Sequence, residues 1–200
     1  YMEHYFIAKE HSESDYFTFK ENMFNREFIF KSCDDIFSKD RVDYGTKVLI
    51  ETVAKNFNLS GNVLDIGCGY GAIAIILASL FSDANFTMCD INKTAVELSQ
   101  ENAKLNNVKN IKEICVSNAY ETIGQGFDYV ITNPPIKAGK QNLLNILDGA
   151  YEHLVSGGKL VFVIKKKHGE DSIRKHLSSI YSNVEILKRD SGYYILCCTK

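Results

Sequence analysis

The feature of this sequence that most constrains its fold is a glycine-rich turn between an apolar strand and an apolar helix. The turn Asp65-Ile66-Gly67-Cys68-Gly69-Tyr70-Gly71 follows strand-forming residues at 63–66 and opens an apolar helix over 72–80. Glycine suits such a turn because a left-handed backbone costs it little and because it lets a ligand approach the main chain closely. The pattern predicts a strand–turn–helix unit with a ligand at the turn.

Strand and helix patterns alternate from residue 62 to the end of the chain. We predict helices over 72–80, 93–105, 141–154 and 170–181, and strands over 63–66, 85–90, 111–116, 127–132, 159–164, 184–187 and 193–197. Repeated strand–helix units indicate a mostly parallel sheet that is covered on both faces. The last two strands are too close in sequence for a crossover helix, so they form a hairpin with one antiparallel strand.

Composition and charge exclude several classes of protein. A 200-residue chain with a net charge of −2 is too weakly charged to coat nucleic acid, although a local basic patch is compatible with it. The longest apolar stretch, 71–81, is too short to span a bilayer, and the first residues show no secretory signal. We therefore expect a cytoplasmic location and no membrane contact. The six cysteines form no CxxC pair and have no histidine at zinc-ligand spacing, so we expect reduced thiols and no metal.

The predicted strand over 85–90 ends in a carboxylate. Asp90 lies 23 residues after Gly67, where a carboxylate can accept hydrogen bonds from both hydroxyls of a ribose. Two cofactor classes share this arrangement. Because Gly67, Gly69 and Ala72 satisfy the loose dinucleotide pattern Gly-x-Gly-x-x-Gly/Ala, a nicotinamide-dependent enzyme remains an alternative at this point.

The motif Asn133-Pro134-Pro135-Ile136 follows the fourth strand and holds the only two prolines of the chain. Two prolines fix two φ angles and remove two N–H donors, which leaves a stiff segment with available carbonyl groups. An exocyclic amino group can donate one N–H to the Asn133 side-chain oxygen and the other to the Pro134 carbonyl. This arrangement turns the nitrogen lone pair toward an electrophilic methyl group, and no general base is needed before transfer.

The glycine-rich turn, Asp90 and the Asn-Pro-Pro motif, in this order, resemble S-adenosylmethionine-dependent methyltransferases with a Rossmann-like fold. More narrowly, the chain resembles small single-domain relatives of the small-subunit rRNA guanine-N2 methyltransferases, in the methyltransferase small domain family. The resemblance extends to Phe37-Ser38 and Asp43-Tyr44-Gly45-Thr46, and it covers residues 15–199. It implies an α/β fold with a seven-stranded, mostly parallel, doubly wound sheet that ends in an antiparallel hairpin.

We expect one domain over 1–200. Apolar and polar residues alternate over 16–20 and 28–31, which predicts a short N-terminal β-hairpin, and Asp43 is placed to cap a following helix. The expected division is a hairpin and cover over 1–46 and a Rossmann-like cofactor-binding and catalytic core over 47–200.

The resemblance implies a role for each matching position. Asp65, Gly67, Cys68, Gly69 and Gly71 would hold the methionine end of S-adenosylmethionine, Asp90 its ribose, and Ile91, Asn118 and Ala119 its adenine, while Phe37 and Ser38 would cover it. Asn133, Pro134, Pro135 and Ile136 would form the catalytic segment, with Asn133 also contacting the cofactor. Related amino methyltransferases often have an aromatic residue at position 136, and Ile136 offers a target base only an apolar face.

Five lysines follow the fourth and fifth strands: Lys137, Lys140, Lys165, Lys166 and Lys167. If these strands are neighbours, the lysines gather beside the Asn-Pro-Pro motif and suit contacts with RNA phosphates. We therefore expect methyl transfer to an exocyclic amine, guanine N2 in ribosomal RNA, with rRNA or a ribosomal subunit as partner. A protein glutamine-amide methyltransferase and a catalytically silent cofactor-binding module remain alternatives, and the sequence predicts no oligomeric state.

Overall fold

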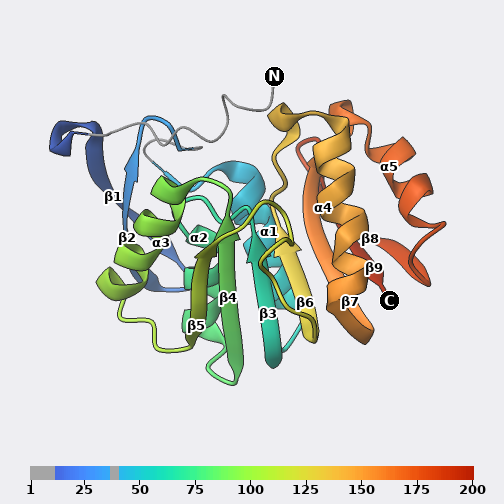
Figure 1. The fold of residues 1–200 in the computed structure, drawn as a ribbon, viewed down its shortest axis with the longest axis horizontal. Helices are drawn as coiled ribbons and strands as arrows, with labels where there is room; N and C mark the ends of the chain where they lie inside the picture. The colour runs from blue at the N-terminus through green and yellow to red at the C-terminus, as the bar shows by residue number, and fades with distance from the viewer. Residues whose placement is uncertain (1–11, 37–40) are drawn as a thin grey trace.

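The computed structural model describes residues 12–36 and 41–200, so the predicted cofactor contacts of Phe37 and Ser38 lie outside the described residues. The described chain forms two β-sheets (Figure 1). The smaller sheet is the antiparallel hairpin of β1 (Tyr16–Met23) and β2 (Arg26–Cys33), in agreement with the sequence prediction.

The larger sheet has seven strands in the order β5-β4-β3-β6-β7-β9-β8. In chain order, the strands are β3 (Gly61–Ile66), β4 (Ala84–Asp90), β5 (Ile111–Val116), β6 (Phe127–Thr132), β7 (Leu154–Lys165), β8 (Asn183–Asp190) and β9 (Tyr193–Thr199). All pairings among β3 to β7 are parallel, and β9 runs antiparallel to both of its neighbours. The predicted fold class is confirmed.

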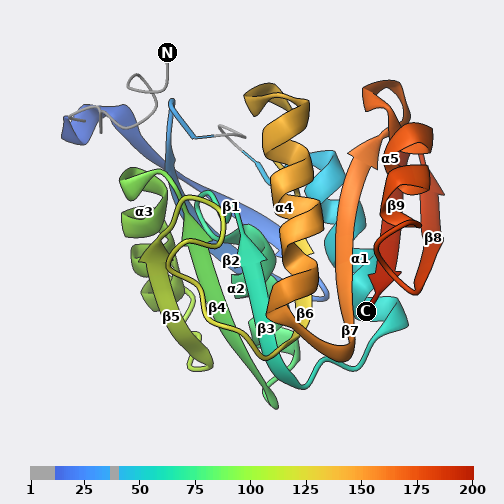
Figure 2. The same ribbon diagram turned by 45° about the vertical axis from the view of Figure 1, so that its right-hand side comes forward.

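Helices cover both faces of this sheet. One face carries α1 (Tyr44–Asn56), α2 (Ala72–Leu80) and α3 (Lys93–Leu105), and the other carries α4 (Lys140–His153) and α5 (Glu170–Leu177). In Figures 1 and 2, α4 crosses in front of β6 and β7 while α1 lies behind the sheet. Because side chains alternate along a strand, Val161 and Val163 of β7 pack toward α1 and Phe162 packs toward α4.

Two asparagines of α3 join the N-terminal hairpin to the core. Asn102 accepts from the Lys31 amide at 2.7 Å and donates to the Lys31 carbonyl at 2.9 Å. Asn106 does the same with Ile29, at 2.9 and 2.8 Å. Each carboxamide therefore satisfies one N–H and one C=O of β2, much as a neighbouring strand would. Figure 1 shows the hairpin beside α3.

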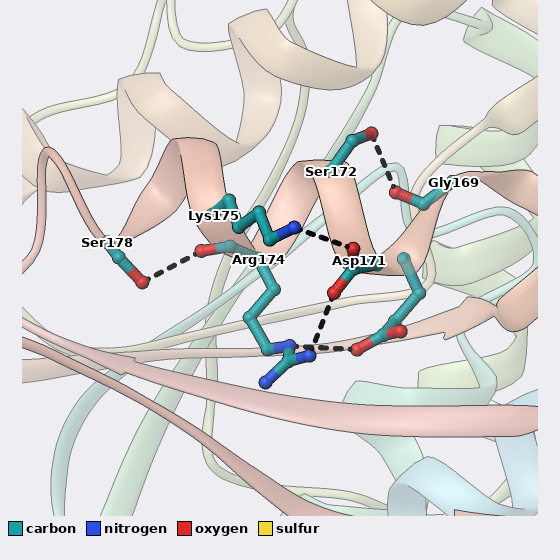
Figure 3. Close-up of polar contacts among 7 residues, drawn as sticks. Gly169, Asp171, Ser172, Arg174, Lys175 and Ser178 are labelled. Atoms are coloured by element: carbon teal, nitrogen blue, oxygen red, sulfur yellow. Dashed lines mark hydrogen bonds and ion pairs between the residues drawn. The ribbon is translucent and has the colours of Figure 1, made fainter.

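Several element ends differ from their predicted positions by one to three residues, and two differ by four or more. β7 begins at Leu154 and not at residue 159, because Leu154 pairs with Phe127 before an irregular stretch over 155–158. α5 ends at Leu177, four residues before the predicted end. There the hydroxyl of Ser178 donates to the Arg174 carbonyl at 2.9 Å (Figure 3), and such side-chain bonds compete with the continuing helix.

Among the described residues, no helix is long and apolar enough to cross a membrane. The same part of the chain contains no group of three or more His, Cys, Asp or Glu side chains that could hold a metal ion. All six cysteines are free thiols, and all but Cys115 are buried. These thiols act as small apolar groups of the core.

Candidate active site at the carboxyl edge of the sheet

The glycine-rich turn lies between β3 and α2, at the edge where the parallel strands end. Gly67, Gly69 and Gly71 all have left-handed backbones, with φ of 73°, 57° and 98°. A Cβ at Gly71 would lie 2.9 Å from Ile75 Cδ1 and 3.1 Å from Ser99 Oγ, whereas a Cβ at Gly67 would meet nothing within 4 Å. Packing therefore requires glycine at 71, and the backbone at 67 faces open space that a ligand can approach.

Asp65 carries a buried carboxyl group directly beneath this turn. Its side chain is 1% exposed, Oδ2 accepts from the Ala74 amide at 3.3 Å, and Oδ1 has no hydrogen-bond partner among the described residues. Burial, with a smaller contribution from Asp90, raises the pKa of Asp65 to about 8. A buried carboxyl oxygen without a partner suits a cationic ligand group, which would lower this pKa again.

Asp90 ends β4 and faces the turn. Oδ2 accepts from the Gly69 amide and Oδ1 from the Asn92 amide, both at 2.9 Å. Burial raises the pKa of Asp90, and these backbone N–H bonds oppose the rise. Each carboxylate oxygen has a further lone pair, so Asp90 can accept two more hydrogen bonds from a pair of neighbouring hydroxyls. Ile91 follows and is partly buried.

The segment after β5 lies beside Asp90. The Ser117 amide donates to the Asp90 carbonyl at 3.0 Å, and the buried Ser117 hydroxyl donates to the Ala119 carbonyl at 2.7 Å. Ala119 adopts a left-handed backbone with φ of 48°, which costs energy for any residue with a Cβ. The exposed Asn118 side chain has one described contact, with Glu121 at 3.5 Å. The structure therefore places Asp90, Asn118 and Ala119 along one edge.

Asn133 follows β6, next to β3 in the sheet, and its carboxamide is held by the start of α1. Asn133 Nδ2 donates to Thr46 Oγ1 at 2.9 Å and lies 3.4 Å from Asp43 Oδ2. Asp43 also caps α1, because the same oxygen accepts from the Thr46 amide at 3.1 Å. With Nδ2 bound in this way, Oδ1 is the atom of the Asn133 carboxamide that remains to accept a hydrogen bond from a substrate.

The two prolines after Asn133 differ in exposure. Pro134 is buried and Pro135 is exposed. A 3-10 turn over Ile136–Ala138 follows, and Ile136 packs in part against the apolar cluster on the α4 side of the sheet. Part of the Ile136 side chain is therefore buried in the core.

Comparison with known proteins identifies the family. The sequence pattern described as the methyltransferase small domain matches residues 27–197. The chain belongs to the methyltransferase small domain family. It is 38% identical over 200 residues to the uncharacterized protein YbxB of Bacillus subtilis, a match that covers 99% of this chain and 98% of YbxB.

Two further similarities concern methyltransferases of known name. The chain is 37% identical over 137 residues to the ribosomal RNA small subunit methyltransferase C of Serratia proteamaculans, covering 66% of this chain and 38% of that protein. The structure of T. thermophilus 16S rRNA N2 G1207 methyltransferase (RsmC), in complex with AdoMet and guanosine, superposes with a TM-score of 0.82 at 23% identity. That match covers 92% of this chain and 50% of the other, and it shows a shared fold.

This chain is accordingly an S-adenosylmethionine-dependent methyltransferase, and S-adenosylmethionine is its cofactor. The residues at the edge of the sheet fit that molecule chemically. The unpartnered oxygen of Asp65 suits an ammonium group, the open backbone at Gly67 admits a ligand, and Asp90 can accept from two ribose hydroxyls.

The five lysines lie in or next to the segments that leave β6 and β7 at the same edge as Asn133. β6 and β7 are hydrogen-bonded neighbours, so the segments after them begin at the same edge. Lys137 and Lys140 follow β6, and Lys165 to Lys167 follow along the end of β7; four of the five are exposed and Lys165 is partly buried.

The acidic residues that follow Lys167 in sequence, Glu170 and Asp171, form their ion pairs within α5. Figure 3 shows that Arg174 and Lys175 bind Asp171 within α5, each at 3.0 Å. Arg174 also binds the buried Glu170 at 3.1 Å. None of the five lysines forms an ion pair with a described residue.

Sequence reasoning missed the residues of α3 that hold the glycine-rich turn. Ser99 Oγ donates to the Gly69 carbonyl at 2.9 Å and lies 3.4 Å from the buried Cys68 thiol, so Cys68 faces α3 with its side chain. Asn102 Nδ2 donates to the Tyr70 carbonyl at 2.8 Å. Both polar residues are fully buried in the apolar face of α3, and a polar residue in an apolar helical stripe is the signal that could have identified them.

Proposed function

We propose that this methyltransferase transfers a methyl group from S-adenosylmethionine to an exocyclic amine, the N2 of guanine in ribosomal RNA. The observation that carries the proposal is the orientation of the Asn133 carboxamide. Thr46 Oγ1 holds its NH2 group at 2.9 Å, and this leaves Oδ1 to accept from an amine. An enzyme that methylates oxygen or carbon needs no such acceptor pair.

In this proposal the cofactor is held by the edge residues already described. Asp65 and the backbone of Gly67 to Gly71 would hold the methionine end, Asp90 would bind the ribose hydroxyls, and Ile91 with Asn118 and Ala119 would enclose the adenine. The two remaining lone pairs of Asp90 support its part in this assignment. We propose Phe37 and Ser38 as the cover of the cofactor. The position of the preceding residue supports this, because Ile36 Cγ2 lies 3.7 Å from the place that a Cβ on Gly69 would take, and Ile36 is therefore next to the glycine-rich turn.

When bound, S-adenosylmethionine supplies an electrophilic methyl group on a sulfonium sulfur. Asn133 Oδ1 and the Pro134 carbonyl would each accept one N–H of the target amine, which positions its lone pair for attack. The nitrogen gains the methyl group and loses one proton to water, and the products are S-adenosylhomocysteine and the N-methylated amine. The prolines supply rigidity, because fixed φ angles keep the acceptor pair in place.

Ribosomal RNA is the favoured substrate for two reasons. The Serratia relative is named a ribosomal RNA small subunit methyltransferase, although this chain spans 38% of its length. The lysines after β6 and β7, which have no described ion-pair partners, also provide a positive surface beside Asn133 for RNA phosphates.

The proposal is tested by Asn133→Ala in methyl-transfer assays with undermodified small ribosomal subunits. We expect turnover to be abolished while the S-adenosylmethionine affinity, measured by calorimetry, stays near wild type. Asn145→Ala is the matched control, because Asn145 is an exposed asparagine of α4 outside the site. Wild-type turnover in Asn133→Ala would contradict the assigned role of the Asn133 carboxamide.

A further inference from the structure

An exposed aromatic ring stands at the start of α1, next to the residues that hold Asn133. Tyr44 is the first residue of the helix, and its side chain is 48% exposed. It directly follows Asp43, whose carboxylate lies 3.4 Å from the Asn133 amide nitrogen. Tyr44 therefore belongs to the same helix start that holds Asn133.

The ring is exposed but held in place. Tyr44 Oη donates to Asp190 Oδ1 at 2.9 Å, and the ring meets the Tyr193 ring edge-on at a centroid distance of 5.7 Å. Asp190 accepts a second hydrogen bond from Ser191 at 2.9 Å. An exposed aromatic ring that is fixed in this way loses little conformational entropy when a ligand stacks on it.

Gly45 leaves room for the Tyr193 ring to pack against the start of α1. A Cβ at Gly45 would lie 2.6 Å from Tyr193 Cε1, so only glycine admits the Tyr193 ring at this place. Gly45 in the first turn of α1 therefore leaves the space in which Tyr193 packs beside Tyr44.

The ammonium group of Lys165 lies next to the second of the two tyrosine rings. Lys165 Nζ lies 5.2 Å from the centre of the Tyr193 ring, and the backbones of Lys165 and Tyr193 pair across β7 and β9. β6, β7 and β9 are consecutive in the sheet, so this group lies about two strand spacings, on the order of 10 Å, from Asn133.

We propose that Tyr44, Tyr193 and Lys165 form a subsite for a nucleotide that flanks the target guanine. Tyr44 stacks on the flanking base, Tyr193 supports the Tyr44 ring, and Lys165 contacts the adjoining phosphate. The subsite rests on the proposed function and deepens it, because it supplies the stacking surface that Ile136 does not offer. It also makes single-stranded RNA around the target the preferred form of the substrate.

The test measures RNA binding and methyl transfer in parallel. The binding probe is a fluorescein-labelled single-stranded RNA hexamer with one central guanosine, and a second hexamer lacks the two bases that flank the guanosine. Both are titrated by fluorescence anisotropy in the presence of S-adenosylhomocysteine. We expect Tyr44→Ala to weaken binding of the complete hexamer roughly tenfold and to leave binding of the abasic hexamer at the wild-type level. Tyr44→Phe keeps the ring and should bind the complete hexamer nearly as wild type does.

Tyr151→Ala is a matched control at the opposite end of β7. Tyr151 also meets a second tyrosine edge-on, Tyr181 at 5.5 Å, and has a lysine over its ring, Lys200 at 4.6 Å. Its replacement should change neither hexamer affinity nor KM for ribosomal subunits, whereas Tyr44→Ala should raise KM with little change in kcat.

Two results would overturn the subsite. Tyr44→Ala could bind the complete hexamer as tightly as wild type, or it could lose affinity for both hexamers equally. If the wild-type enzyme methylates subunit RNA in either case, the proposed function stands without the subsite. If the wild-type enzyme places no methyl group in subunit RNA, both proposals fall.

Discussion

Asn133 is oriented by residues that stand about ninety positions earlier in the chain. Thr46→Val removes the hydroxyl that accepts from Asn133 Nδ2 and leaves only the longer contact with Asp43 at 3.4 Å, so the carboxamide is held less firmly and can present the wrong group to an amine. We expect kcat to fall at least roughly tenfold, with Thr46→Ser restoring most of it and cofactor affinity unchanged in both variants. An unchanged kcat in Thr46→Val would show that the Thr46 contact does not orient the acceptor.

Asp90 is the residue that the proposed function assigns to the ribose hydroxyls. Asp90→Ala removes an acceptor of charge-assisted hydrogen bonds and should weaken S-adenosylmethionine binding at least roughly tenfold in calorimetry. Asp83→Ala is the control, since Asp83 is an exposed carboxylate that precedes β4 at its other end. Equal affinities of the wild type and Asp90→Ala would remove Asp90 from the ribose site.

Asp65 predicts a pH dependence of stability in the ligand-free protein. Burial raises its pKa to about 8 in the folded state from the ordinary value of 3.8. Between these values the folded protein keeps a proton that the unfolded chain releases, so the free energy of unfolding falls as pH rises, by about 1.4 kcal/mol per pH unit. Asp65→Asn cannot titrate and should lose this slope in urea unfolding between pH 5 and 7. Parallel pH profiles for the wild type and the variant would contradict the raised pKa.

The residues of the site divide into those the sequence could predict and those it could not. Asp65, Asp90 and Asn133 each lie at the end of a predicted strand, so their meeting follows from a parallel sheet. Thr46 and Asn102 act through contacts across 87 and 71 positions, which no local pattern encodes.

At the scale of elements, α3 couples the hairpin to the glycine-rich turn. Asn102 is fully buried and pairs with both the Lys31 backbone and the Tyr70 carbonyl, so Asn102→Ala leaves three backbone groups without a partner. We expect the free energy of unfolding to fall by roughly 3 kcal/mol in urea titration, with faster amide exchange in β1 and β2 and weaker cofactor binding. Asn106→Ala should lower stability less and leave cofactor affinity intact, because Asn106 contacts no residue of the turn. Equal effects of the two variants on cofactor affinity would exclude the coupling.

α2 and α3 were predicted to the residue, and the largest errors lie where another interaction competes with the periodic pattern. α3 over Lys93–Leu105 has a capping asparagine at its start and buried residues along one face. The end of α5 was wrong because serine hydroxyls take the last carbonyls, a local competition that apolar periodicity does not report. The start of β7 was wrong because two glycines precede its predictable part.

At the scale of the whole molecule, the carboxyl edge of one sheet brings together everything that the proposed reaction needs. β4 contributes Asp90, β6 contributes Asn133 and β7 contributes Lys165, while the start of α1 orients the acceptor and presents Tyr44. The division into a cover over 1–46 and a core over 47–200 stays a prediction, although α1 already begins at Tyr44.

The central claim is tested most directly by the chemical identity of the methylated product. Labelled S-adenosylmethionine is incubated with the enzyme and undermodified small ribosomal subunits, and the RNA is digested to nucleosides and separated from ribosomal protein. The account predicts label in N2-methylguanosine and none in protein. Label in a glutamine side chain of a protein, or in any nucleoside other than N2-methylguanosine, would contradict it.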